Sequence, residues 1–392
     1  MRGLAALVVV ASHAWRSHWN DPSGGTTTFL YSSAEHVYGG WTTHVLSILG
    51  NGAAAVNLFF AISGFVLLQS LTRGPDSNWV NAARFVVARV FRIYPAVLVT
   101  IGTFILIFYA TGASICSPAA YEPVKLLRNA LLLDTEIVGV MWTLRVEILA
   151  IPLFILGFFL LRRFGNIGLV ILLATLLALA TWRVWTGLVD PTPGLALLPF
   201  FAVGMLVFGV GKKPWSWIPS GLAAALLIVA IAVMLSVPLL PDFGARPYHI
   251  ETVCDAYIVG LLAFANLGTV GRFFEHPIVR FYGRISYSFY LINLLTLFAF
   301  WHMPEALGQI MQLPIPGILV ALTMFLISVA VTTPIAWLMY KYVERPGVAL
   351  GRRLVAVQFK EWLPLRPAPA DLASPHALPR QIRFSPCSAA RG

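Results

Sequence analysis

Long uninterrupted apolar segments constrain this chain more than any other feature. Residues 221–237 and 317–339 contain no charged side chain. Each approaches the roughly 20 residues that an α-helix needs to cross a bilayer. The strands of a membrane β-barrel are short and alternate apolar with polar residues, so this pattern excludes a barrel. Because only 11% of the 392 residues are charged, against about 25% in soluble domains, the sequence predicts an all-α polytopic membrane protein.

Ten segments share this apolar character, and we expect about ten transmembrane helices. They lie at 3–17, 52–72, 91–110, 138–161, 167–186, 195–210, 219–238, 253–270, 284–302 and 316–340. The first is not expected to be a cleavable signal peptide, because no basic region precedes it and no small-residue cleavage site follows.

The positions of the basic residues predict the orientation. With the N-terminus in the cytoplasm, the segments on that side carry sixteen Lys and Arg residues and the opposite segments carry five. Such asymmetry is typical of cytoplasmic loops. The prediction is therefore that both termini are cytoplasmic. The net charge of +11 then reflects loops that face anionic lipid, and we expect no nucleic-acid partner.

The chain divides into two regions. Residues 1–353 form the expected transmembrane domain, and residues 354–392 are rich in Pro, Arg, Ala and Ser without hydrophobic periodicity. Such composition is typical of disorder, so a disordered cytoplasmic tail is predicted. The three cysteines lack CxxC spacing, the eight histidines lack metal-ligand spacing, and HExxH, GxSxG and Walker A motifs are absent. We therefore expect no metal cofactor.

Arg2 and His13 are candidate site residues within the first apolar segment. Eleven steps of about 100° bring both to one helix face, and a rise of ~1.5 Å per residue separates them by ~16 Å. We expect Arg2 at the cytoplasmic edge and His13 near the middle of the membrane. Ionisable residues at that depth are functional candidates by default. The alternative is a structural histidine bonded to a neighbouring helix, with Arg2 as a topology charge.

Arg89 and Arg92 lie three residues apart on one face of a helix end, close to Arg84. The guanidinium group binds phosphate oxygens in a bidentate manner, so the pair suggests a binding site for a phosphorylated ligand. The alternative is that these arginines are only the positive charges expected of a cytoplasmic loop.

Glu147 is a third candidate, two residues after Arg145. Their side chains diverge by about 200° around a helix, so each needs a partner elsewhere. A buried carboxylate here would orient or stabilise a histidine on another helix. The alternative is a structural ion pair. Ser63 and Gly64 favour close helix packing. Asp255 lies near the start of a predicted span, where we expect its carboxylate to contact water.

Six motifs together resemble a known family. They are Arg2-x10-His13, Phe59-Phe60-x2-Ser63-Gly64-Phe65, Arg89-x2-Arg92-Ile-Tyr-Pro95, Trp142-Thr-Leu-x2-Glu147, Gly283-Arg-Ile-Ser286-Tyr287-Ser-x-Tyr290-Leu291 and Tyr342-x-Glu344-x-Pro346. In this order they are similar to acyltransferase family 3 over about residues 1–353. These are integral-membrane O-acyltransferases that modify surface polysaccharides and some glycosylated metabolites.

The resemblance implies ten or so transmembrane helices and transfer of an acyl group, often acetyl, from cytoplasmic acyl-CoA. It implies functional roles for Arg2 with His13, for Arg89 with Arg92, and for Glu147. One departure stands in the fifth motif, where the family usually has His after the Tyr-Leu pair and this chain has Ile292-Asn293. The departure questions a role for that helix in proton transfer.

The activity expected from this resemblance is O-acyl transfer by a protein of the inner (plasma) membrane, from acyl-CoA, often acetyl-CoA, to a hydroxyl of a carbohydrate or glycosylated acceptor. Arg89 and Arg92 would bind the donor phosphates, and His13 would accept the hydroxyl proton with Glu147 stabilising the imidazolium. Alternatively, His13 would carry the acyl group covalently. The rival class is a transporter or flippase for a lipid-linked sugar or anionic metabolite, because intramembrane Arg, Glu and His also mark transport paths. The two halves show neither a repeat nor paired broken helices, which disfavours the rival.

Overall fold

The computed structural model describes residues 1–15, 45–46, 48–74, 78–113, 116–186, 194–237, 246–301 and 317–358. Within these ranges every regular element is a helix. The first half comprises α1 (Arg2–Trp15), α4 (Gly52–Thr72), α5 (Asn78–Thr111), η1 (Pro118–Tyr121), α6 (Pro123–Ala130), η2 (Gly139–Met141), α7 (Trp142–Leu149), α8 (Ile151–Phe164) and α9 (Asn166–Thr186). The second half comprises η3 (Leu195–Leu197), α10 (Leu198–Val210), α11 (Ser220–Ser236), α12 (Arg246–Phe264), α13 (Gly268–Glu275), α14 (Pro277–Trp301), α16 (Gly317–Met339), η5 (Tyr340–Glu344) and α17 (Arg345–Gln358).

A helix covers most or all of each of the ten predicted apolar segments. By length and composition, five described helices can cross a membrane, and a sixth crossing is possible if α12 and α13 count as one span bent by 87°. The apolar helices α1, α10 and α11 are shorter. The all-helical membrane class is therefore confirmed, while ten crossings and cytoplasmic termini stay predictions.

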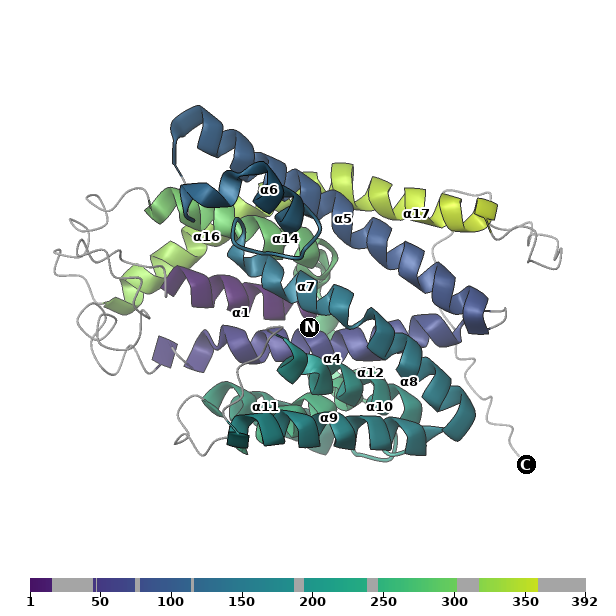
Figure 1. Ribbon diagram of the computed structural model, residues 1–392. Coiled ribbons are helices and arrows are strands. Elements are labelled where there is room, and N and C mark those ends of the chain that lie inside the picture. Colours follow the sequence, from purple (N-terminus) through teal and green to yellow (C-terminus); the bar gives the residue numbers. More distant parts are fainter. Residues whose placement is uncertain are drawn as a thin grey trace, which may run out of the picture.

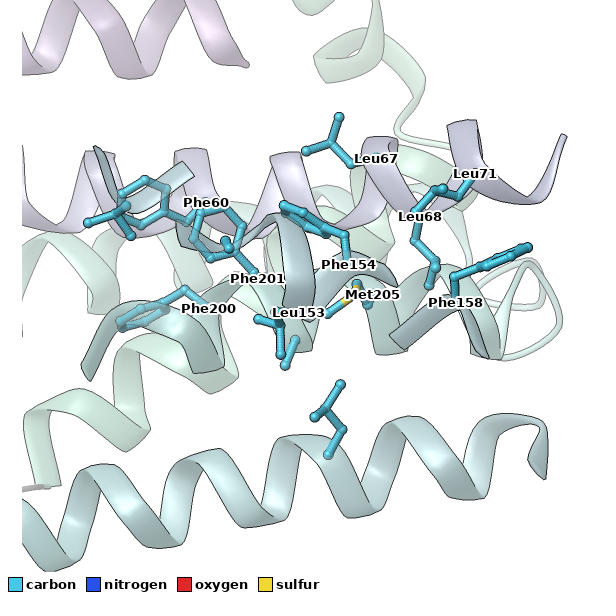
Figure 2. Close-up of a cluster of buried hydrophobic side chains, with 14 of the residues drawn as sticks. Phe60, Leu67, Leu68, Leu71, Leu153, Phe154, Phe158, Phe200, Phe201 and Met205 are labelled. Atoms are coloured by element: carbon cyan, nitrogen blue, oxygen red, sulfur yellow. The ribbon is translucent and has the colours of Figure 1, made fainter. Parts of the chain in front are cut away.

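Helix α4 lies at the centre of the bundle and packs closely against α10. A Cβ atom added at Gly64 would collide with the Phe201 backbone, and one at Gly204 would collide with Ala61. Small residues thus let the two backbones approach, as is common between membrane helices. Figure 2 shows the aromatic cluster beside this contact, where Phe60 meets side chains from α8 and α10. This packing gives the centre of the bundle a rigid frame.

Helix α1 completes the other side of this frame. It lies between α4 and α14 and also touches α16. Gly3 packs tightly on α14, because a Cβ there would lie 2.5 Å from the Gly283 nitrogen. Near the other end of α1, Ser12 packs tightly on Gly52 of α4. A Cβ added at Gly52 would lie 2.8 Å from the Cβ of Ser12. Both ends of α1 are thereby fixed against their neighbours.

Helix α5 runs beside the C-terminal helical segment that includes η5 and α17 (Figure 1). Helix α5 has 34 residues, which is about 51 Å and longer than a bilayer core. Helices α16, η5 and α17 are continuous, and η5 is a π-helical turn, a feature frequent at functional sites. Helix α17 continues to Gln358, five residues beyond the predicted boundary at residue 353, and the disordered tail stays a prediction. Residues 359–392 lie outside the described residues.

Candidate active site

Arg2 lies against the middle of α4. Its Nη2 donates to Ser63 Oγ at 3.2 Å, and its guanidinium carbon lies 5.3 Å from the centre of the Phe59 ring. Ser63 Oγ in turn donates to Glu147 Oε1 at 3.4 Å. Ser63, expected to serve packing, therefore links two of the predicted site residues, while its neighbour Gly64 makes the close helix contact.

The membrane depths expected for Arg2 and His13 stay predictions, but both residues can be placed along α4. Ser63 is the twelfth of the 21 residues of α4, so Arg2 reaches the middle of that span rather than its edge. Ser12 contacts Gly52, the first residue of α4, so His13 lies close to the opposite end. Arg2 is therefore held within the bundle by Ser63, about half the length of α4 away from His13.

Glu147 forms a buried ion pair with Arg89. The Arg89 Nη2 to Glu147 Oε2 distance is 2.5 Å, and the two side chains are 8% and 11% exposed. This confirms that Glu147 takes a partner other than Arg145. Both carboxylate oxygens are engaged, one by Arg89 and one by Ser63. Both of its hydrogen bonds therefore hold Glu147 near Arg2, at the end of α1 opposite to His13. This geometry does not support the expected stabilisation of the His13 imidazolium by Glu147.

Arg92 pairs with a second buried carboxylate. Its Nη2 lies 3.2 Å from Glu344 Oε1, and Ser288 Oγ donates to the other oxygen at 2.9 Å. The Tyr287 ring lies beneath the Arg92 guanidinium at 5.9 Å. Glu344 belongs to the π-helical turn η5, so this turn ties α5 to the C-terminal helices.

A cavity of about 620 Å³ opens beside these ion pairs, and we call it the basic cavity. Its cationic lining residues are Arg2, Arg84, Arg89, Arg92 and Arg352, joined by Ser70 and Asn81. Its described lining contains no acidic residue. The Nε atoms of Arg2 and Arg89 are buried and have no acceptor among the described residues. Buried donors need acceptors, so this lining suits an anionic ligand.

A second, narrow cavity of about 30 Å³ runs along α1. Ala6 and Val9 line it, and they share the α1 face with Arg2 and His13 because the spacings are four, three and four residues. Glu147 and Tyr290 line it on the other side, with Phe59 and Phe60 from α4. The narrow cavity therefore lies between the level of the Arg89–Glu147 ion pair and the level of His13.

His13 contacts the residue at which the sequence departs from the family pattern. Its Nδ1 lies 3.2 Å from Asn293 Oδ1, and Asn293 Nδ2 donates to the Tyr290 carbonyl at 2.7 Å. The Tyr290 carbonyl fixes the orientation of the amide, so Oδ1 must face the imidazole. Nδ1 is then the protonated nitrogen, and the lone pair of neutral His13 lies on Nε2. Asn293 thus selects the tautomer of His13.

The comparison with known proteins follows from these features. The sequence profile of the acyltransferase domain of acyltransferase family 3 matches residues 1–341. The chain belongs to this family. Nodulation protein 10 of Rhizobium leguminosarum bv. viciae is 35% identical over 115 residues, which are 29% of this chain and 24% of that protein. The aligned part is thus about a quarter of the relative. No solved structure matches significantly.

This acyltransferase gathers most, but not all, of its predicted site residues. Ser63 links Arg2 to Glu147, and Arg89 pairs with Glu147 directly. Arg92 lines the basic cavity together with Arg2 and Arg89. His13 lies apart, on the far side of the narrow cavity. Sequence reasoning assigned no site role to three residues that contact the site, namely Ser63, which it assigned to helix packing, Asn293 and Glu344. Their polarity within apolar helices was the available signal. Among the described residues, no three His, Cys, Asp or Glu side chains cluster as metal ligands.

Proposed function

We propose that this acyltransferase moves a short acyl group, acetyl being the simplest, from acyl-CoA to a hydroxyl of a carbohydrate or glycosylated acceptor. The proposal places the protein in the inner membrane, with the basic cavity open to the cytoplasm. The basic residues of the loops support this orientation, since sixteen lie on one side and five on the other.

The observation that carries the proposal is the order of the two cavities. The basic cavity suits the phosphates of a nucleotide-bearing donor. The narrow cavity runs along α1 and is lined mostly by apolar side chains, so it suits the uncharged acyl end of such a donor. Arg89 lines the first cavity and Glu147 lines the second. Their ion pair therefore lies at the boundary between the two cavities. On one side of it the phosphates of a thioester donor would bind, and on the other side its uncharged acyl end would bind.

The chemistry that follows uses His13 as a general base. Nε2 accepts the proton of the acceptor hydroxyl, the hydroxyl oxygen attacks the thioester carbonyl, and the coenzyme A thiolate leaves and takes the proton back. Asn293 accepts from Nδ1–H throughout and holds the ring. In the alternative route, Nε2 attacks the thioester itself and an acyl-histidine forms before the acceptor is acylated.

The rival transporter reading is less well supported, because the match to an acyltransferase domain over residues 1–341 favours acyl transfer.

The test uses purified protein in proteoliposomes with [¹⁴C]acetyl-CoA and a panel of nitrophenyl glycosides as acceptors. We expect label in an acceptor and a loss of roughly 10²- to 10⁴-fold for His13→Ala, the usual contribution of a general base. Val8→Ala, on the same helix, serves as the matched control and should stay active. Normal insertion of His13→Ala with more than a few per cent of wild-type turnover would refute both routes through His13.

A further inference from the structure

Three of the five arginines that line the basic cavity, Arg89, Arg92 and Arg352, differ in how available they are to a ligand. Arg89 and Arg92 are held by Glu147 and Glu344 at 2.5 and 3.2 Å, so carboxylates already neutralise them. Arg352 is exposed, lines the cavity, and has no carboxylate partner among the described residues. Its full charge therefore faces the cavity.

Helix α17 is positioned so that Arg352 must face the cavity. One of its faces carries Gly347 and Gly351, where an added Cβ would lie 2.7 Å from Pro95 Cγ and 2.6 Å from Phe91 Cβ of α5. Glycines four residues apart allow this close approach of two helices. The adjacent face carries Val348, Arg352 and Val355, spaced by four and three residues, and all three line the basic cavity. The glycine face fixes the helix, and the arginine face completes the wall.

We propose that Arg352 binds the phosphates of acyl-CoA and that α17 forms one wall of the nucleotide part of the donor site. This rests on the proposed function and adds a residue that lies beyond the matched residues 1–341. Coenzyme A carries about four negative charges on its pyrophosphate and ribose phosphate, and Arg352 offers a fork-shaped donor group for these oxygens.

The proposal changes the role of Arg89. Because its charge is compensated within the bundle, its principal task is to hold Glu147 at the boundary of the two cavities. Arg352 then contributes more to donor affinity than Arg89 does. Arg92 lies between these cases, since it pairs with Glu344 yet remains 37% exposed at the cavity wall.

The test is a comparison of two donors in the full-length protein in detergent. Acetyl-CoA carries the phosphates, whereas acetylpantetheine has the same thioester arm and none of them. Dissociation constants are measured by calorimetry for the wild type, for Arg352→Ala and for Arg353→Ala. Arg353 is the matched control because it is the next residue, is exposed, and does not line the cavity. We expect Arg352→Ala to weaken acetyl-CoA binding about tenfold or more, to leave acetylpantetheine binding unchanged, and Arg353→Ala to behave as wild type.

The outcomes are distinguishable. A wild type that does not bind acetyl-CoA refutes the proposed function itself. A wild type that binds, with Arg352→Ala binding equally well, refutes the role of Arg352 alone. Equal losses for both donors, or for both variants, also overturn it, because they indicate general damage to α17 or loss of overall charge. If Arg352→Ala does not purify as a folded protein, Arg352→Lys decides: an intermediate affinity for acetyl-CoA supports the proposal, and wild-type affinity contradicts a forked contact.

Discussion

His13 Nδ1 and Asn293 Oδ1 lie 3.2 Å apart, although 280 residues separate them in the chain. Asn293 is fully buried, and its amide nitrogen is occupied by the Tyr290 carbonyl. The amide therefore has one orientation, and the histidine has one tautomer. Asn293 stands where the family usually has histidine, yet α14 still contacts the site through it. Asn293 orients the imidazole of His13 on α1.

Substitution of Asn293 tests this positioning role. In Asn293→Ala the imidazole loses the acceptor that fixes its tautomer, so we expect kcat to fall roughly ten- to a hundredfold, less than a lost general base. Donor affinity should stay unchanged, because the basic cavity is at the other end of α1. Steady-state kinetics with a donor-binding measurement separate the two. Asn293→Asp keeps an oxygen at this position and should retain more activity. A variant Asn293→Ala with wild-type kcat would contradict the role.

The Arg89–Glu147 ion pair predicts a specific pattern of stability. Either single change to leucine leaves the other charge buried without its partner, which typically costs about 3–5 kcal/mol. The double variant Arg89→Leu/Glu147→Leu removes both charges and should recover most of that loss. Thermal unfolding in detergent measures the three variants. Acyl transfer should stay absent in the double variant, since neither cavity keeps its boundary residue. A double variant less stable than both single variants would contradict the prediction.

The sequence predicts the helices of this protein better than the contacts between them. Apolar length alone places one helix at 52–72, and α4 spans Gly52–Thr72. The diverging directions of Arg145 and Glu147 also correctly predict that Glu147 takes its partner from elsewhere. The partners themselves depend on tertiary packing: Glu147 meets Arg89 from 58 residues away. Local spacing contains no information on such pairs, and it equally leaves open which arginines of a basic cluster are neutralised.

Asp255 shows the same limit. Its position near the start of a predicted span indicated contact with water, but α12 begins earlier, at Arg246. Asp255 thus lies deep in the helix, is fully buried, and has no hydrogen-bond partner for either oxygen among the described residues. The water expectation was wrong because the polar first turns of α12 are helical as well.

An unpaired buried carboxylate that is not part of the site should tolerate a neutral isostere. A buried ionised group costs several kcal/mol without a partner, so Asp255→Asn should unfold at the wild-type temperature or above it and keep its transfer activity. Glu147→Gln is the contrasting variant, because it removes the charge that Arg89 needs, and it should lose both stability and activity. The unfolding midpoint and the transfer rate of each variant check this. Loss of activity in folded Asp255→Asn would instead assign Asp255 to the mechanism.

Topology is the final prediction, because the donor site depends on it. The basic asymmetry predicts that the loop at 111–137 lies outside and that the loop at 211–219 lies in the cytoplasm. Ser117 and Ser216 are exposed residues of these loops. With the three native cysteines replaced, Ser117→Cys should react with a membrane-impermeant maleimide in intact spheroplasts, and Ser216→Cys only after permeabilisation. The basic cavity lies at the end of α4 that leads to Arg73, which the same asymmetry places inside. The reverse labelling pattern would put Arg352 and the whole basic cavity on the side that lacks acyl-CoA, and the donor assignment would have to be abandoned.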